Sequence, residues 1–199
     1  MSEASPGPAE VLRGGLRQPD RRSCGASVLV AARMLAEPAY AVSFAAAPSA
    51  TFAREVLVLH RRVTGTHDVA GRLQLPWPRT IGTPPWAVSR HLTTMSGVPH
   101  ATRPTRLGPR DEVEQVRVAV GGGHPVALYV GDRWLPRHVV LVVGASATAW
   151  QVYEPASGRV LDVATDAVRT HDLALAGWDV PWFVVRPRVV RPPAPRSPA

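Results

Sequence analysis

Apolar residues recur at helical spacing through the first 120 positions of the chain. The run Cys24–Glu37 is rich in Ala, Val and Leu and is followed by a proline, which predicts a buried helix. Apolar positions three or four apart, with Arg between them, predict a second helix over Ala50–Val63 and a third over Pro85–Met95. An acidic first turn indicates a fourth helix over Arg110–Val120.

The pattern changes from helical to extended after a run of three glycines at 121–123. Short β-branched runs separated by turns then predict the strands of an antiparallel sheet. The predicted strands are Pro125–Val130, Val139–Gly144, Ala149–Glu154, Arg159–Val163 and Trp182–Val185. Helices first and strands second describe a layered α+β domain.

The length of 199 residues suits one domain with short extensions. Residues 1–10 are small, polar and contain prolines, so we expect a flexible arm; residues 11–185 form the domain. Residues 186–199 are rich in Pro and Arg and predict a disordered tail. No apolar run reaches the roughly 18 residues of a membrane span, and no signal peptide is recognised, so we expect a cytoplasmic protein.

The formal net charge of +8 comes entirely from Arg, since the chain has no Lys. Four of these residues, Arg186, Arg188, Arg191 and Arg196, lie in the predicted tail. No recognised basic and aromatic motif accompanies them, so we expect no nucleic-acid partner. An anionic partner for the Arg-rich tail remains an alternative.

Cys24 is the only cysteine, which excludes an intramolecular disulfide and a zinc site built from several thiolates. A lone thiol of this kind is either an inert core residue or a nucleophile. The predicted helix begins at Cys24, which places its sulfur beside unpaired amides and the positive end of the helix dipole. Both effects favour the thiolate, and Gly25 would allow a substrate backbone to approach closely.

A thiolate nucleophile needs a base, and His138 stands at the entry of a predicted strand, where rigid backbone would hold it. Glu154 ends the next predicted strand and is placed to orient the imidazole, with Asp162 as a substitute acceptor. Gln18, in the irregular segment before Cys24, could direct its amide toward a developing oxyanion.

Two blocks of this sequence resemble the C39-like peptidases. Gln18 followed by Cys24, Gly25 and Ala26 is similar to the family's oxyanion glutamine and nucleophile. His138 through Gly144, followed by the turn 154–158, is similar to its histidine strand and Asp-Pro-x-x-Gly turn. The resemblance implies a papain-like fold and cleavage of a peptide or protein substrate, often after a double glycine in a secretion leader, with no metal cofactor. The family's usual Asp is Glu154 here, one methylene longer.

Other readings of these residues stay open at this point. The same Cys and His pair could transfer an acyl group to an amine, or the chain could be an inactive relative that binds peptides. Three tryptophans, Trp77, Trp86 and Trp134, could line a substrate cleft or pack in the core. The remaining histidines show no metal-ligand spacing and are expected to be ordinary surface or core residues: His60, His67, His91, His100, His124 and His171.

Overall fold

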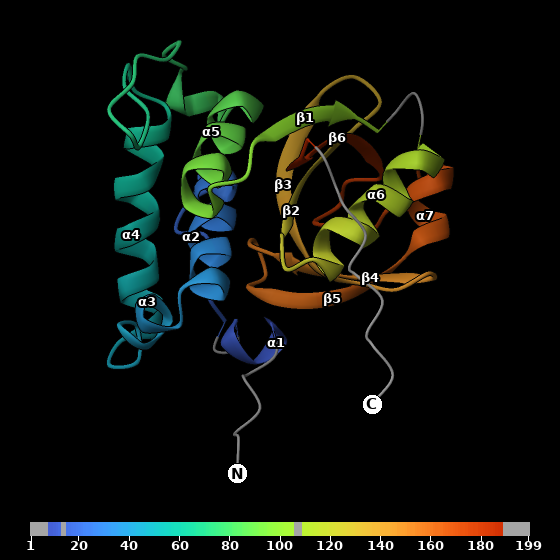
Figure 1. Ribbon diagram of the computed structural model, residues 1–199, viewed down its shortest axis with the longest axis horizontal. Coiled ribbons are helices and arrows are strands. Elements are labelled where there is room, and N and C mark those ends of the chain that lie inside the picture. The colour runs from blue at the N-terminus through green and yellow to red at the C-terminus, as the bar shows by residue number, and fades with distance from the viewer. Residues whose placement is uncertain (1–7, 13–14, 106–108, 189–199) are drawn as a thin grey trace.

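The computed structural model describes residues 8–12, 15–105 and 109–188. Within them an antiparallel sheet is covered by helices on both faces, so the α+β class predicted from the sequence is confirmed (Figure 1). The helices are α1 (Pro8–Val11), α2 (Cys24–Ala36), α3 (Pro38–Val42), α4 (Pro48–Val63), the 3-10 turn η1 (Arg79–Ile81), α5 (Pro85–Ser96), α6 (Pro109–Gly121) and α7 (Thr165–Thr170). The strands are β1 (His100–Pro104), β2 (Val126–Gly131), β3 (Pro136–Ala145), β4 (Ala149–Glu154), β5 (Arg159–Ala164) and β6 (Val180–Pro187).

The sheet has the strand order β1-β6-β2-β3-β4-β5, and every pair of neighbours is antiparallel. Strand β2 is buried along its whole length, and β3 is buried over its central positions. Strands covered on both faces read as continuous apolar runs, which is why both were recognisable in the sequence.

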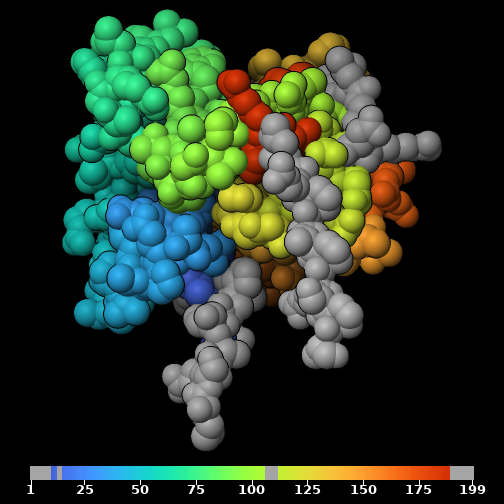
Figure 2. Space-filling view, viewed as in Figure 1, coloured from blue at the N-terminus to red at the C-terminus, as the bar shows by residue number. Residues whose placement is uncertain are grey.

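Two apolar cores lie on the two faces of the sheet. Alternate residues of the central strands, such as Tyr129 and Leu141, face α2, α4 and α5. Their neighbours, such as Leu128 and Val140, face α6 and α7. The described part of the molecule therefore has three layers, with the sheet in the middle. In Figure 2 the blue to green surface of the first half of the chain lies to the left of the yellow to red surface of the second half.

Helix α2 is the central helix of the first layer and lies between α4 and the sheet (Figure 1). Its first nine residues and Met34 are all buried. A helix that is apolar on nearly every side must be enclosed by other elements, and α4, α5 and β3 enclose this one. The position of α2 fixes the position of Cys24, its first residue.

The four predicted helices are present, with ends that differ from the expectation by no more than two residues, and so are the five predicted strands. The structure adds α1, α3, η1, α7 and β1. Pro38 stops α2 as expected, but it also opens α3, because proline is well suited to the first turn of a helix. Strand β1 is a short, half-exposed edge strand that pairs only with β6, so it lacks a clear apolar alternation.

The boundaries of the domain differ from the sequence prediction at both ends. Helix α1 begins at Pro8, inside the expected arm, and Leu12 is buried. Arg186, predicted as the first residue of the tail, instead belongs to β6, is 7% exposed and pairs with Glu112 of α6 at 2.7 Å. A buried arginine is stable there because its charge has a partner. Residues 1–7 and 189–199, with Arg191 and Arg196, lie outside the described residues.

Among the described residues, no helix combines the length and the apolar character needed to cross a membrane.

Candidate active site

Cys24 is the first residue of α2, as the sequence predicted. The chain reaches it through a turn in which the Asp20 carboxylate accepts hydrogen bonds from the amides of Arg22 (2.8 Å) and Ser23 (2.9 Å). Ser23 is the N-cap, but no side chain caps the helix, and the first helical bond runs from the Ser27 amide to the Ser23 carbonyl at 2.8 Å. The amides of the first turn, that of Cys24 included, therefore have no acceptor within the helix.

Thr83, in the segment that leads into α5, packs against the first turn of α2 next to Cys24. A Cβ added to Gly25 would lie 2.6 Å from the Thr83 side chain, so only glycine fits at this position. The Thr83 carbonyl accepts a hydrogen bond from the buried Tyr129 hydroxyl at 2.9 Å. Burial, together with the nearby Cys24, raises the pKa of Tyr129 well above its ordinary value, so this hydroxyl keeps its proton. Gly25 thus makes room for Thr83, whereas the sequence had suggested that it makes room for a substrate.

A β-bulge in β3 lies directly before His138. Val130 of β2 pairs with His138, but Gly131 pairs with Pro136, which leaves Arg137 as an extra residue in β3 directly before the histidine. A Cβ on Gly131 would overlap the Leu135 carbonyl, so the tight return from β2 to β3 requires glycine there. Bulges redirect the neighbouring side chain and increase local twist, and this one lies next to the predicted base.

Asp132 holds the loop between these strands in one conformation. Its carboxylate accepts hydrogen bonds from the amides of Trp134 (2.7 Å) and Leu135 (2.8 Å) and from the Arg137 guanidinium (3.0 Å). Its carbonyl accepts a hydrogen bond from the Trp182 indole at 2.9 Å. The loop presents Trp134, 68% exposed, and Leu135, 52% exposed, to solvent three or four residues before His138.

His138 and Glu154 form a buried pair. The His138 Nε2 donates to the Glu154 carboxylate at 2.7 Å, and the two residues are 6% and 3% exposed. The same carboxylate accepts hydrogen bonds from the amides of Ala156 and Ser157, both at 2.7 Å. Burial raises the pKa of Glu154, but the hydrogen bonds from His138 and from this turn outweigh it and lower the pKa to about 2. Glu154 is therefore an anion held by three donors.

Cys24 is the third member of this group. Burial lowers the pKa of His138, while hydrogen bonds with the Cys24 and Glu154 side chains and the charges of both outweigh burial and raise it to about 9. Because Nε2 is committed to Glu154, Nδ1 is the ring nitrogen left for the thiol. The structure thus brings together the three residues that the sequence singled out as nucleophile, base and orienting acceptor.

The segment before Cys24 is fastened to the turn that carries Glu154. The Tyr153 hydroxyl donates to the Leu16 carbonyl, the Gln18 amide donates to the Pro155 carbonyl at 2.8 Å, and the Arg17 guanidinium donates to the Ala156 carbonyl at 2.9 Å. These contacts join the two sequence blocks that resemble the C39-like peptidases.

Gly158 allows this contact because of its backbone conformation. Its φ of +69° is in the left-handed region, and a Cβ there would lie 2.8 Å from the Gly15 carbonyl carbon and 3.0 Å from that of Leu16. Any other residue would have to push the 15–16 backbone away from the Glu154 turn.

Gln18 lies in this fastened segment, but its side chain bonds to its own turn. The Gln18 Nε2 donates to the Asp20 carbonyl at 2.8 Å rather than to Cys24 or His138, and its buried Oε1 has no partner among the described residues. A primary amide nitrogen carries two hydrogens, so this bond leaves one hydrogen for a ligand.

The other residues considered from the sequence lie outside this group. Asp162 is exposed on β5, and Glu154 is the acceptor that bonds to His138. Trp77 and Trp86 pack edge to face with ring centroids 5.0 Å apart, and Trp86 also packs against the core. Contacts within the protein therefore account for the positions of both rings. Within the described parts of the chain, no group of three or more His, Cys, Asp or Glu is arranged to hold a metal ion.

The residues that support the site were not found from the sequence. Gly131 followed by Asp is a common hairpin turn and could have indicated the tight loop before His138. Tyr129 reads as one more apolar position of a buried strand, and Thr83 lies in a proline-rich connection with no local signal. Their roles arise only from tertiary packing against Cys24 and Gly25.

Comparisons with known proteins add no family to these observations: no protein-family model and no curated protein matches this chain. The chemistry therefore rests on the structure, which brings together a thiol at a helix start, an imidazole and a carboxylate. This arrangement can pass the thiol proton to the imidazole and keep the resulting imidazolium paired with a carboxylate.

Proposed function

We propose that this chain is a cysteine hydrolase that cleaves a peptide or amide bond through an acyl-enzyme on Cys24. The observation that carries the proposal is the buried series Cys24, His138 and Glu154, in which the pKa of His138 is raised to about 9. At neutral pH such an imidazole holds a proton, which is the condition for a neighbouring thiol to act as a thiolate.

In the proposed reaction the Cys24 sulfur attacks the carbonyl carbon, and the carbonyl electron pair moves to the oxygen. The uncapped amide of Cys24 and the second Nε2 hydrogen of Gln18 would stabilise this oxyanion. The tetrahedral intermediate then collapses, the bond to the amine breaks, and His138 gives its proton to the leaving nitrogen. Water then loses a proton to His138 and attacks the acyl carbon, the bond between that carbon and the sulfur breaks, and the acid is released with the thiolate and imidazolium restored.

A papain-like fold and membership of the C39-like peptidases are part of this proposal. They are supported by the placement of Cys24 on a helix against one face of an antiparallel sheet and of His138 and Glu154 on neighbouring strands of that sheet. The substitution of Glu for the family's Asp is supported chemically by the Glu154 carboxylate, which reaches the imidazole and also accepts two amides of its own turn.

The test is the rate at which iodoacetamide alkylates Cys24, the only thiol of the chain. The same protein unfolded in urea is the matched reference, because a thiol in an unfolded chain is only a few per cent thiolate at pH 7. We expect the folded protein to react at least about tenfold faster at pH 7, and His138→Gln to remove this difference. Equal rates for folded and unfolded protein would refute the proposal.

The low exposure of the site supports a second candidate, an inactive relative that binds peptides. Cys24 is 5% exposed and His138 6%, so a substrate carbonyl has a narrow approach to the sulfur. In that case Cys24→Ser would leave peptide binding unchanged and no peptide would be cleaved. Acyl transfer to an amine uses the same residues and would be recognised by a new amide product.

A further inference from the structure

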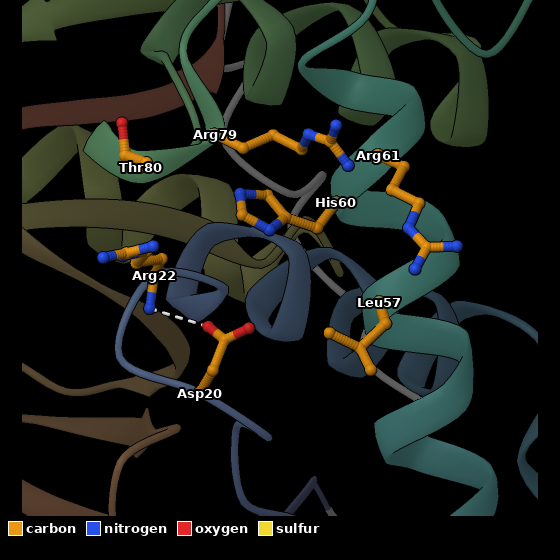
Figure 3. Close-up of a pocket in the computed structure, with 7 residues that line it drawn as sticks. All are labelled: Asp20, Arg22, Leu57, His60, Arg61, Arg79 and Thr80. Carbon is orange, nitrogen blue, oxygen red and sulfur yellow. Dashed lines mark hydrogen bonds between the residues drawn. The ribbon is translucent and has the colours of Figure 1, made fainter.

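A pocket of about 380 Å³ opens beside the loop that precedes Cys24 (Figure 3). It does not include Cys24 or His138. Three segments far apart in the sequence form it: the 20–22 turn, helix α4 and the 3-10 turn η1. The side chains that matter for its chemistry are Asp20, Arg22, His60, Arg61, Arg79 and Thr80.

The lining of this pocket is strongly basic. Three guanidinium groups, those of Arg22, Arg61 and Arg79, line the pocket together with one carboxylate, that of Asp20, which leaves two formal positive charges. None of the three guanidinium groups makes an ion pair or hydrogen bond with any residue that the structure describes. The Asp20 carboxylate is already engaged by the amides of its own turn. Three unpaired arginines around one cavity create a positive potential that favours an anion.

His60 provides an independent sign of a ligand. Its side chain projects from α4 between Arg79 and Asp20 in Figure 3, and the residue is only 5% exposed. The Nε2 atom of its ring is buried and makes no well-formed hydrogen bond among the described residues, although the Gly82 backbone lies near the ring. A buried polar atom without a partner costs free energy, and such an atom in the lining of a pocket indicates a group that the ligand would satisfy.

We propose that this pocket binds a phosphate group. A carboxylate is satisfied by one arginine, whereas a phosphate dianion offers enough acceptor oxygens for guanidinium groups that arrive from three elements. Its charge matches the two formal positive charges of the lining. Phosphate also suits His60, because its oxygens can accept a hydrogen bond from a charged ring and, in the monoanion, its hydroxyl can donate one to a neutral ring.

The volume of the pocket exceeds that of a phosphate ion, so a phosphate ester of a small organic molecule would also fit. Inorganic phosphate and such an ester share the chemistry that the arginines recognise. No residue of the pocket belongs to the Cys24, His138 and Glu154 group, so phosphate binding and the proposed thiol reaction can be tested separately.

The proposal is tested by titrating the ¹⁵N-labelled protein with inorganic phosphate, glycerol phosphate and acetate at constant ionic strength. We expect saturable shifts of the amides of Arg22, Thr80 and their neighbours, and an affinity about tenfold weaker in Arg79→Gln, which loses one charge-assisted contact. Arg54→Gln is the matched control: it removes the same charge from an exposed position of α4 that does not line the pocket.

Tighter binding of glycerol phosphate than of inorganic phosphate would support the proposal and identify an ester as the ligand, and equal binding would support it with phosphate itself. Equal affinities for Arg79→Gln and Arg54→Gln, or acetate binding as well as phosphate, would overturn it. Cys24→Ser should bind phosphate like the unmodified chain, so a failure here leaves the thiol hydrolase proposal unaffected, and the reverse also holds.

Discussion

Replacing Glu154 with glutamine tests the buried pair on which the proposed reaction depends. The change keeps the shape of the side chain but replaces one acceptor oxygen with a nitrogen that can only donate. Three donors now bond to this carboxylate at 2.7 Å: the His138 Nε2 and the amides of Ala156 and Ser157. At least one of them must lose its acceptor in the variant.

The expected cost follows from these contacts. A hydrogen bond to a charged group contributes about 1.5–3 kcal/mol, and breaking a buried ion pair costs about 3–5 kcal/mol. The His138 ring can release its proton to reduce the loss, so we expect the free energy of unfolding at pH 7 to fall by about 3 kcal/mol. Burial then opposes the imidazolium without help from Glu154, and the pKa of His138 should fall from about 9 toward its ordinary value of 6.5.

Two measurements check this result. Urea unfolding followed by tryptophan fluorescence gives the change in stability, and NMR titration of the His138 ring gives its pKa. Glu114→Gln is the control, since it makes the same change in an exposed ion pair on α6 and should leave the free energy of unfolding almost unchanged. Glu154→Asp keeps the negative charge on a side chain that is one methylene shorter. Its loss of stability should lie between those of Glu154→Gln and Glu114→Gln. Our account of the site is wrong if Glu154→Gln behaves like the control and the pKa of His138 stays near 9.

Two further predictions concern pH and the backbone. Because the pKa of His138 is raised above its unfolded value of 6.5 to about 9, its stabilisation is fully present below pH 6.5 and is lost as the pH rises through 9. The stability advantage over His138→Gln, measured by urea unfolding from pH 5 to 10, should shrink in that window; a constant difference would contradict the assignment. Gly158 and Gly97 both have φ of +69°, but a Cβ meets nothing within 4 Å at Gly97. Thermal unfolding should therefore show a cost of about 1 kcal/mol for Gly97→Ala and about 3 kcal/mol or more for Gly158→Ala, with slower alkylation of Cys24 only in the second; equal costs would show that the 15–16 backbone does not press on this turn.

The parts of the fold that the sequence predicted are those with a strong local pattern. The α2 helix and strands β2 to β5 carry long apolar runs or clear turns, so their type and approximate ends could be read directly. Strand β1 and helix α7 could not, because their apolar positions are few and tertiary contacts decide their conformation. Arg186 was misplaced for the same reason: its partner Glu112 lies 74 residues away in sequence.

The candidate site divides in the same way. The positions of Cys24 at a helix start and of His138 and Glu154 on neighbouring strands follow from local pattern and order along the chain. Local pattern does not predict two other features of the site: the contact of Gly25 with Thr83, and the hydrogen bond from the Gln18 amide to the Asp20 carbonyl. Both depend on how separate segments pack, which a single sequence does not specify.

The fastening of the 15–18 segment to the Glu154 turn has a consequence for biosynthesis. Leu16 and Tyr153, which share a hydrogen bond, are 137 residues apart, so this contact is unavailable until most of the chain has left the ribosome. During translation Cys24 emerges long before the histidine and the carboxylate that would activate it. Under the proposed reaction, a nascent or truncated chain would lack the base for Cys24, which would gain both of its partners only in the completed protein.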